Sequence, residues 1–497
     1  MKKILIANRG EIAVRVIRAC RELNISPVAV YSECDRAALH VRLADEAYAI
    51  GPSAPRESYL RIDRIVEVAK KSGADAVHPG YGFLAENEDF AAAVRDAGVT
   101  FIGPTPAAIE TMGSKTAART AAKRAGVPVV PGTEDPLAPD VPDGDIAAAA
   151  ERIGFPLLVK AVAGGGGKGM RTVGDRSDLA NAVRAARSEA GAAFGDAAIY
   201  LERRLTRPRH IEVQLLGDEH GTVVPFVERE CSIQRRHQKV VEETPSLAVT
   251  REVRHAMTAA AAAVAKAVGY TNAGTIEFLL DEHGSFYFLE MNTRLQVEHP
   301  ITEMVTGLDL VRWQIRIARG ERLDVDPERL LTPNGHAVEC RVYAEDPASG
   351  FLPQSGPLWL YREPAGPGVR VDSGFREGDT IAVHYDPLIA KLIVSAESRT
   401  TALHRLERCL REFPILGIRT NVPFLLALVR HPDVRAGRLD TGLIDREIER
   451  LVAESTPADP VPPAVAAAAS LADTNRRSPT ASPIGDDPWT TLGGWRN

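Results

Sequence analysis

The segment Glu290-Met-Asn-Thr-Arg-Leu-Gln-Val-Glu-His-Pro300 combines acids, amides and an arginine within a few positions of one another. It follows the β-type run Ser285–Leu289, so the strand is expected to continue into it. Because side chains alternate along a strand, Glu290 and Asn292 point to the same face. That face is either an ordinary solvated strand surface or a cluster of oxygen ligands.

An upstream β-type run, Gly274–Leu280, is expected to pair with this strand. If His283-Gly284 forms a tight two-residue turn, Glu277 lies directly opposite Glu290, with Cβ atoms roughly 5 Å apart. Like charges in that position destabilise a ladder, whereas a divalent cation between them reverses the effect. Two carboxylates and an amide oxygen on one face favour Mg²⁺, which leads us to predict a metal site at Glu277, Glu290 and Asn292.

The composition is that of an ordinary globular protein. The 497 residues leave room for about three domains. A net charge of −6, from 60 basic and 66 acidic residues, argues against general nucleic-acid binding. No apolar run approaches the length of a membrane span, so no membrane association is expected. The five cysteines are scattered and lack metal-ligand spacing, which favours reduced thiols and a cytoplasmic location.

Residues 1–115 alternate strand and helix patterns, which predicts a parallel sheet with helices on its faces. The expected elements are the strands 3–7, 27–31 and 74–78 and the helix 11–22. The loop His78–Phe83 ends one of these strands, where ligands often bind, although its two glycines are equally consistent with a simple turn.

The chain divides further along its length by pattern and composition. We expect an α/β unit at 1–115, a helical linker at 116–131, a small unit at 132–204, the largest unit at 205–446 and a Pro/Ala-rich, disordered tail at 447–497.

The small unit contains the run Ala163–Gly169, with five glycines between two expected strands, Pro156–Lys160 and Gly169–Val173. Such a run offers backbone N–H groups that approach an anion closely. Lys160 and Lys168 add positive charge, so phosphate binding is favoured over a flexible surface hairpin. The Walker pattern is absent.

Two further segments carry donors and acids. Glu228–Lys239 contains Gln234, His237 and Lys239, which could hold a nucleotide and a second anion. Arg294, Gln296 and Glu298 share a face if the strand stays extended. A cation, an amide and a carboxylate can bind a small oxyanion and remove its proton. The residues alone therefore indicate an ATP–Mg²⁺ enzyme that forms an acyl phosphate.

Five segments together closely resemble the biotin carboxylase component of biotin-dependent carboxylases, within the ATP-grasp superfamily. They are Ile6–Ile12, His78–Leu84, Gly164–Gly169, Glu228–Pro245 and Glu290–Pro300. The resemblance covers residues 1 to about 446. It implies a Rossmann-like N-terminal α/β domain, an ATP-grasp lid at 132–204 and a C-terminal ATP-grasp and biotin carboxylase C domain.

The resemblance also implies residue roles. ATP is expected to bind Lys115, Lys160, Gly166, Gly167, Met170, Glu202, Arg203, Arg204, Leu205, His210, Gln234, His237, Glu277 and Glu290. Mg²⁺ or Mn²⁺ is expected at Glu277, Glu290 and Asn292. Bicarbonate is expected at Lys239, Arg294, Gln296, Val297 and Glu298, with Glu298 as the base. Biotin is expected near Tyr81 and Arg341, with Arg341 stabilising its enolate.

The implied reaction is carboxylation of biotin through carboxyphosphate, as the first half-reaction of an acetyl- or propionyl-CoA carboxylase. No biotinyl-lysine motif follows residue 446, so the carrier is expected on another polypeptide unless this chain is a shortened form. A carboxyltransferase and a homodimer or larger holoenzyme are implied. The alternatives are a pyruvate, methylcrotonyl-CoA or urea carboxylase, another ATP-grasp ligase, or a nucleotide-binding subunit without turnover.

Overall fold

The computed structural model describes residues 1–162 and 170–455. The predicted phosphate loop with Gly166 and Gly167 lies outside the described residues, as does the tail from residue 456. Helix α16 (Leu443–Ser455) extends past residue 447, where the tail was expected to begin, because Leu451 packs into a hydrophobic core.

The N-terminal part is a five-stranded parallel sheet in the order β3-β2-β1-β4-β5. This confirms the sheet predicted from strand–helix alternation. Its strands are β1 (Lys3–Ile6), β2 (Ser26–Ser32), β3 (Glu46–Gly51), β4 (Ala76–His78) and β5 (Thr100–Phe101). Its helices are α1 (Gly10–Glu22), α2 (Leu39–Leu43), α3 (Ile62–Ser72) and α4 (Glu88–Asp96). The predicted apolar stripe of α1 is buried, and the loop after β4 opens at the carboxyl edge of the sheet.

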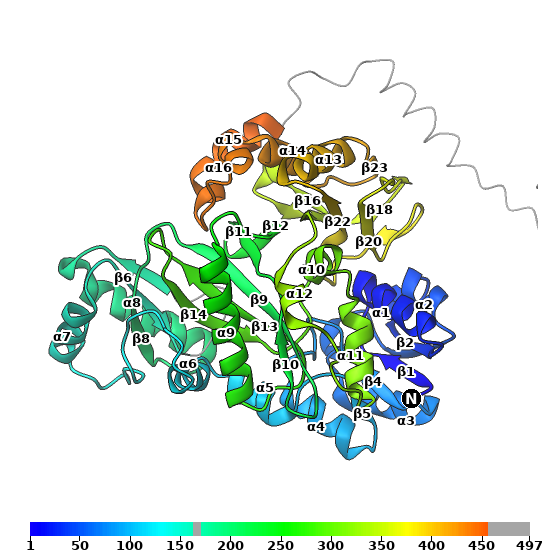
Figure 1. Ribbon diagram of the computed structural model, residues 1–497, viewed down its shortest axis with the longest axis horizontal. Helices are drawn as coiled ribbons and strands as arrows, with labels where there is room; N and C mark the ends of the chain where they lie inside the picture. The colour runs from blue at the N-terminus through cyan, green and yellow to red at the C-terminus, as the bar shows by residue number, and fades with distance from the viewer. Residues whose placement is uncertain (163–169, 456–497) are drawn as a thin grey trace, which may run out of the picture. The chain divides into compact units, whose positions relative to one another are not determined.

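A small antiparallel sheet, β7-β6-β8, forms the projecting unit at the left of Figure 1. Its elements are α7 (Asp143–Ile153), β6 (Leu157–Ala161), β7 (Met170–Val173), α8 (Arg176–Phe194) and β8 (Ile199–Arg203). Helices α5 (Pro106–Gly113) and α6 (Lys115–Arg124) connect it to the N-terminal sheet.

One large antiparallel sheet runs through the rest of the chain in the order β14-β13-β9-β11-β12-β15-β22-β20, with β10 beside β9. Its strands are β9 (Arg209–Gly217), β10 (Val223–Pro225), β11 (Arg229–Arg235), β12 (Gln238–Thr244), β13 (Asn272–Leu280), β14 (Phe286–Asn292), β15 (His336–Tyr343), β20 (Val369–Ser373) and β22 (Leu388–Ala396). Helix α9 (Arg251–Ala267) packs its apolar stripe over β9 and β13 (Figure 1).

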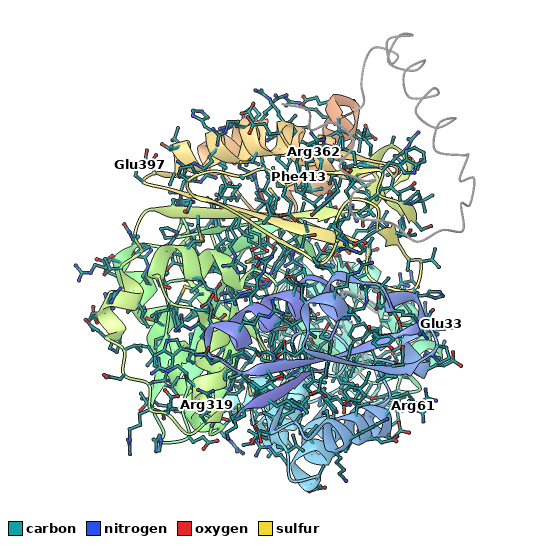
Figure 2. The ribbon with its side chains drawn as sticks, turned by 90° about the vertical axis from the view of Figure 1, so that its right-hand side faces the viewer. Glu33, Arg61, Arg319, Arg362, Glu397 and Phe413 are labelled. Atoms are coloured by element: carbon teal, nitrogen blue, oxygen red, sulfur yellow. The ribbon has the colours of Figure 1, made fainter. Side chains whose placement is uncertain are left out.

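The C-terminal helices cover one face of β15 and β22, as Figure 2 shows with the helices in orange above the yellow strands. These helices are α13 (Arg399–Arg411), α14 (Val422–Arg430), α15 (Pro432–Ala436) and α16. Three short strand pairs flank them: β16 (Glu345–Asp346) with β17 (Leu352–Pro353), β18 (Gly356–Pro357) with β21 (Thr380–Ile381), and β19 (Leu360–Tyr361) with β23 (Ile415–Leu416). The remaining helices are α10 (His299–Thr306), α11 (Leu310–Ala318) and α12 (Pro327–Leu331).

None of the described helices is long and apolar enough to cross a membrane. All five cysteines are free thiols.

The β13–β14 hairpin has the predicted pairing of Glu277 with Glu290, but the predicted turn is wrong. Asp281 pairs with Ser285, so the loop has three residues rather than two, and only Gly284 adopts a positive φ. A bulge at Leu289 adds one residue to β14 and restores the register beyond it. The loop is one residue longer than predicted and the bulge adds one residue to the other side, so the two changes cancel and Glu277 still pairs with Glu290.

The N-terminal and C-terminal parts of the chain meet where Gly374, after β20, approaches the start of α1. A Cβ atom at Gly374 would lie 2.6 Å from backbone atoms of Gly10. Backbone cannot move aside cheaply, so only glycine fits there. We expect Gly374→Ala to lower the free energy of unfolding by about 1–3 kcal/mol in urea titrations. Gly144→Ala, in open space on α7, should leave it unchanged or raise it by up to about 1 kcal/mol. Equal effects of both changes would contradict the close approach.

Candidate active site

The ammonium group of Lys239 lies at the centre of the site. Its Nζ is 2.5 Å from Glu212 Oε2, 2.8 Å from Glu277 Oε1 and 2.7 Å from Glu298 Oε1. All three carboxylates are buried. One cation therefore joins three anions that come from β9, β13 and the loop after β14.

The large sheet produces this arrangement. Glu212 of β9 and Glu277 of β13 are direct cross-strand partners, so their carboxylates share a face. The second oxygen of Glu212 accepts from Arg229 Nε, which is fully buried beside it. Two cations hence compensate carboxylates that would otherwise repel each other at this spacing.

The charges shift the protonation equilibria of the group. Burial disfavours the charged forms, but the three carboxylates hold the pKa of Lys239 well above its usual value. Lys239 and Arg341 hold the pKa of Glu298 well below its usual value despite its burial. Burial likewise opposes ionisation of Glu277, yet Lys239 and His210 lower its pKa. The group is an ionised network at neutral pH.

The predicted metal residues come together at the β13–β14 pair. Asn292 Nδ2 donates to Glu277 Oε1 over 2.9 Å, and Glu290 lies opposite Glu277. The Glu290 side chain is exposed and has no hydrogen bond or ion pair within the described residues. Desolvation by the surrounding protein atoms, together with the Glu277 charge, raises its pKa. Asn292 Oδ1 accepts from Arg294 Nη2 over 3.0 Å, so the amide would have to turn to offer its oxygen to a metal. Paired carboxylates with an amide side chain beside them fit Mg²⁺ or Mn²⁺, and a bound cation would relieve the Glu277–Glu290 repulsion.

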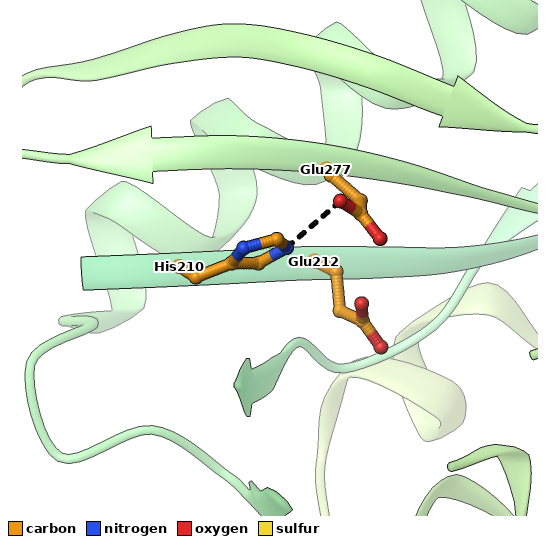
Figure 3. A group of neighbouring side chains, drawn as sticks. All are labelled: His210, Glu212 and Glu277. Carbon is orange, nitrogen blue, oxygen red and sulfur yellow. Dashed lines mark ion pairs between the residues drawn. The ribbon is translucent and has the colours of Figure 1, made fainter. Parts of the chain in front are cut away.

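His210 lies between Glu277, one of the predicted metal residues, and Gln234, one of the predicted nucleotide residues. Figure 3 shows its ring directed at Glu277, with Nε2 2.9 Å from Oε2, and Glu212 beside them on the same strand face. The Gln234 amide donates to the other ring nitrogen over 2.9 Å. Burial opposes the charged form of His210, but the Glu277 carboxylate raises its pKa.

The predicted oxyanion residues do not lie on an extended strand, because β14 ends at Asn292 and α10 begins at His299. That expectation of a shared strand face was wrong. The turn nevertheless gathers the side chains: Arg294 Nη1 donates to Gln296 Oε1 over 2.9 Å, and Gln296 Nε2 donates to Glu277 Oε1 over 3.2 Å.

Tyr81 and Arg341, the residues predicted to contact biotin, lie near the loop that carries Val297 and Glu298. Arg341 Nη2 donates to Glu298 Oε2 over 3.1 Å. The carbonyl of Val297 accepts from Lys391 Nζ over 2.9 Å, and the same Nζ lies 5.8 Å from the centre of the Tyr81 ring. Tyr81 and Arg341 therefore approach the same loop from the N-terminal and large sheets.

A cavity of about 780 Å³ lies between the small sheet and the large sheet. Of the predicted nucleotide residues, it is lined by Lys160, Met170, Glu202, Arg203, Arg204, Leu205, His210, Gln234 and His237. The volume of this cavity and the lysine and arginine side chains in its lining suit a nucleotide.

Lys115 and Lys160 add positive charge near this cavity. Lys160 pairs with Glu202 and so is held by β8, while Arg119 Nη1 holds the other Glu202 oxygen over 2.9 Å. Lys115 begins α6, and burial lowers its pKa although the Glu290 charge acts in the opposite direction.

Sequence reasoning missed several residues of the site. Glu212 lies two positions after His210, so strand alternation could have placed it on the same face. Glu86 accepts from Arg294 Nε over 2.7 Å, and Asp440, Thr441, Gly442, Asp445 and Arg446 line the cavity between the two sheets. Long-range pairings of this kind leave no local signal in one sequence.

Three family models match consecutive parts of the chain. They are described as the biotin carboxylase N-terminal domain at residues 1–109, the carbamoyl-phosphate synthase L chain ATP-binding domain at 114–326, and the biotin carboxylase C-terminal domain at 339–446.

Curated proteins and solved structures are also similar. A pyruvate carboxylase component of Methanothermobacter thermautotrophicus is 53% identical over 444 residues, 89% of each chain. The methylcrotonoyl-CoA carboxylase α-subunit of Dictyostelium discoideum is 48% identical over 496 residues, 99% of this chain and 70% of that one. The biotin carboxylase domain dimer of Hydrogenobacter thermophilus 2-oxoglutarate carboxylase, solved with MgADP, ADP and bicarbonate, has a TM-score of 0.86 at 47% identity, covering 92% of this chain and 99% of that one.

The central role of Lys239 predicts a pH-dependent loss of stability when its charge is removed. In the wild type, ionised Glu277 and Glu298 stabilise the fold above the usual Glu pKa of about 4.3, and this contribution is lost as pH falls through their lowered values. In Lys239→Met the three buried carboxylates keep only Arg229, His210 and Arg341 as partners, so their pKa values rise relative to the wild type and the loss of stability grows as pH rises.

We therefore expect Lys239→Met to lower the free energy of unfolding by about 3–5 kcal/mol near pH 8 and by less near pH 5. Arg176→Met, which removes an exposed pair with Glu151, should change it by less than about 0.5 kcal/mol at either pH. Urea titrations at both pH values measure this. A deficit that shrinks toward high pH would contradict the ionised network.

Proposed function

The chain belongs to the biotin carboxylase family, and we propose that it uses ATP and bicarbonate to carboxylate biotin. The observation that carries this proposal is the position of Lys239. It bridges Glu277, one of the predicted metal residues, and Glu298, in the loop 293–298 that holds predicted bicarbonate residues and is called the oxyanion loop below. A nucleotide phosphate at the predicted metal site and a small oxyanion at this loop would be direct neighbours.

In the proposed first step, Lys239, Arg294, Gln296 and the backbone of Val297 hold bicarbonate. Glu298, kept ionised by Lys239 and Arg341, accepts the bicarbonate proton. A bicarbonate oxygen then forms a bond to the γ-phosphorus of ATP, and ADP leaves with the electrons of the broken bond. The product is carboxyphosphate.

A divalent cation held by Glu277, Glu290 and Asn292 would supply positive charge to the ATP phosphates. The protein's own contribution there is to fix Glu277 from three sides, by Lys239, His210 and Asn292. These contacts place the carboxylate before the nucleotide binds, which reduces the reorganisation needed during reaction.

In the second step, carboxyphosphate separates into CO₂ and phosphate. The phosphate takes the N1′ proton of biotin, and N1′ then bonds to CO₂. Arg341 places positive charge where the biotin ureido oxygen becomes negative, and Tyr81 borders the same space. The biotin is carried by a separate carrier protein or domain.

We assign this half-reaction to an acyl-CoA carboxylase, together with a carboxyltransferase and a homodimeric or larger assembly. The similarity to the methylcrotonoyl-CoA relative extends over 496 residues, whereas that to the pyruvate carboxylase relative covers 444. A 2-oxo acid as the final acceptor is the alternative, because relatives of both kinds are similar. Pull-down of the carboxyltransferase and assays with acetyl-, propionyl- and methylcrotonyl-CoA or pyruvate would separate them.

ADP release by the purified chain tests the half-reaction itself. With ATP and Mg²⁺, release should require bicarbonate and rise with free biotin. Release that is indifferent to both compounds would exclude biotin carboxylation and point to another ATP-grasp substrate.

The base assignment predicts a separation of binding from turnover. We expect Glu298→Gln to lower bicarbonate-dependent ADP release by about 100- to 10,000-fold, because the amide cannot accept the proton. ATP affinity, measured by calorimetry, should be nearly unchanged. Glu282→Gln, at the exposed tip of the β13–β14 hairpin, is the matched control and should retain full activity. Loss of ATP binding in Glu298→Gln, or retained turnover, would contradict the assignment.

A further inference from the structure

The two faces of β15 have opposite character. Val338, Cys340 and Val342 are buried in the apolar core under α13 and α14. Glu339 and Arg341, on the other face, are buried on the side where Arg341 reaches Glu298. Charged residues inside a sheet face are costly unless each has a partner, so their arrangement is informative.

A pair of glutamates lies on this charged face without a cation between them. Glu242 of β12 is the direct cross-strand partner of Glu339, and both side chains are fully buried. Glu242 Oε1 accepts from Arg341 Nε over 2.6 Å. Its other oxygen and both oxygens of Glu339 have no hydrogen-bond partner within the described residues.

Two ionised carboxylates cannot face each other in such a place, so one of them holds a proton. Glu242 accepts from the guanidinium of Arg341, so it is the more readily ionised of the two. Burial and the nearby Glu242 hold the pKa of Glu339 well above its usual value, although Lys391 acts in the opposite direction. Burial also raises the pKa of Glu242, to about 7, against the effect of Arg341.

Arg341 is consequently held at two points. Glu242 binds Nε, at the base of the guanidinium, and Glu298 binds Nη2, at its tip, over 3.1 Å. Lys391 of β22 is the cross-strand partner of Arg341, so a second cationic residue lies beside the arginine on the same face of the sheet. If Glu298 takes up a proton during reaction, Glu242 is the anion that still fixes the arginine.

We propose that Glu242 is a positioning residue that holds Arg341 toward biotin throughout the cycle, while protonated Glu339 provides a neutral neighbour that leaves Glu242 free to pair with the arginine. This inference rests on the proposed function. It assigns Glu242 no contact with substrate. Its effect is to keep Arg341 aimed at the developing negative charge when the Glu298 contact weakens.

The test compares two isosteric changes in this one carboxyl pair. Glu242→Gln removes the charge that pairs with Arg341. Glu339→Gln replaces a neutral carboxyl with a neutral amide of the same size. For each variant, ADP release is measured with saturating ATP, Mg²⁺ and bicarbonate, with and without free biotin, and the ratio of the two rates is taken.

Glu242→Gln should lower the ratio of biotin-stimulated to unstimulated release by about 10- to 100-fold, the loss of one buried charge-assisted hydrogen bond. Glu339→Gln should retain the wild-type ratio. A merely structural role would reduce both rates together and leave the ratio unchanged. An unchanged ratio in Glu242→Gln, or an equal fall in both variants, would overturn the proposal.

A double-mutant cycle removes any remaining ambiguity about folding. In an Arg341→Gln background, Glu242→Gln should cause no further fall in the ratio, because the residue it positions is gone. Additive losses would overturn the proposal. Failure of the proposed function is distinguishable, since the wild type itself would then show no bicarbonate- and biotin-dependent release.

Discussion

The contacts of one ammonium group with three buried carboxylates, which Arg229, His210 and Arg341 help to compensate, control the architecture of this site. Lys239 contacts Glu212, Glu277 and Glu298, and each of these reaches it only if its own backbone element is in register. A one-residue slip of β9 or β13 would turn a carboxylate to the opposite face and leave Lys239 under-compensated in a buried position. The ion cluster therefore links strand register to site geometry.

The same cluster explains how two chemically different sites become neighbours. Glu277 is one of the proposed metal residues, near the cavity that we assign to the nucleotide, and Glu298 lies in the proposed oxyanion loop and accepts from Arg341. Lys239 contacts both and neutralises charge on each side. Two anions, such as a terminal phosphate and a small carboxylate, could approach each other there with less repulsion than in water. This proximity is the physical basis for phosphoryl transfer between them.

Local pattern in the sequence was sufficient for the parallel N-terminal sheet, the stripe of α1 and the pairing of Glu277 with Glu290. The last of these held although the turn was wrong, because the bulge at Leu289 offset the longer loop. Bulges have no reliable sequence signal. Glu86, Glu242 and the cavity residues of 440–442 and 445–446 were not found, since their role depends on contacts between distant parts of the chain. The extended conformation expected after Asn292 failed because α10 begins at His299.

The claim that a bicarbonate oxygen attacks the γ-phosphorus beside Lys239 can be tested by isotope transfer. The chain would be incubated with ATP, Mg²⁺, biotin and ¹⁸O-labelled bicarbonate in unlabelled water, and the released phosphate analysed by mass spectrometry. The account predicts one ¹⁸O atom in each phosphate formed in step with carboxybiotin, because the bridging oxygen of carboxyphosphate stays on phosphorus. Phosphate without label would show that water attacks instead and would contradict the account.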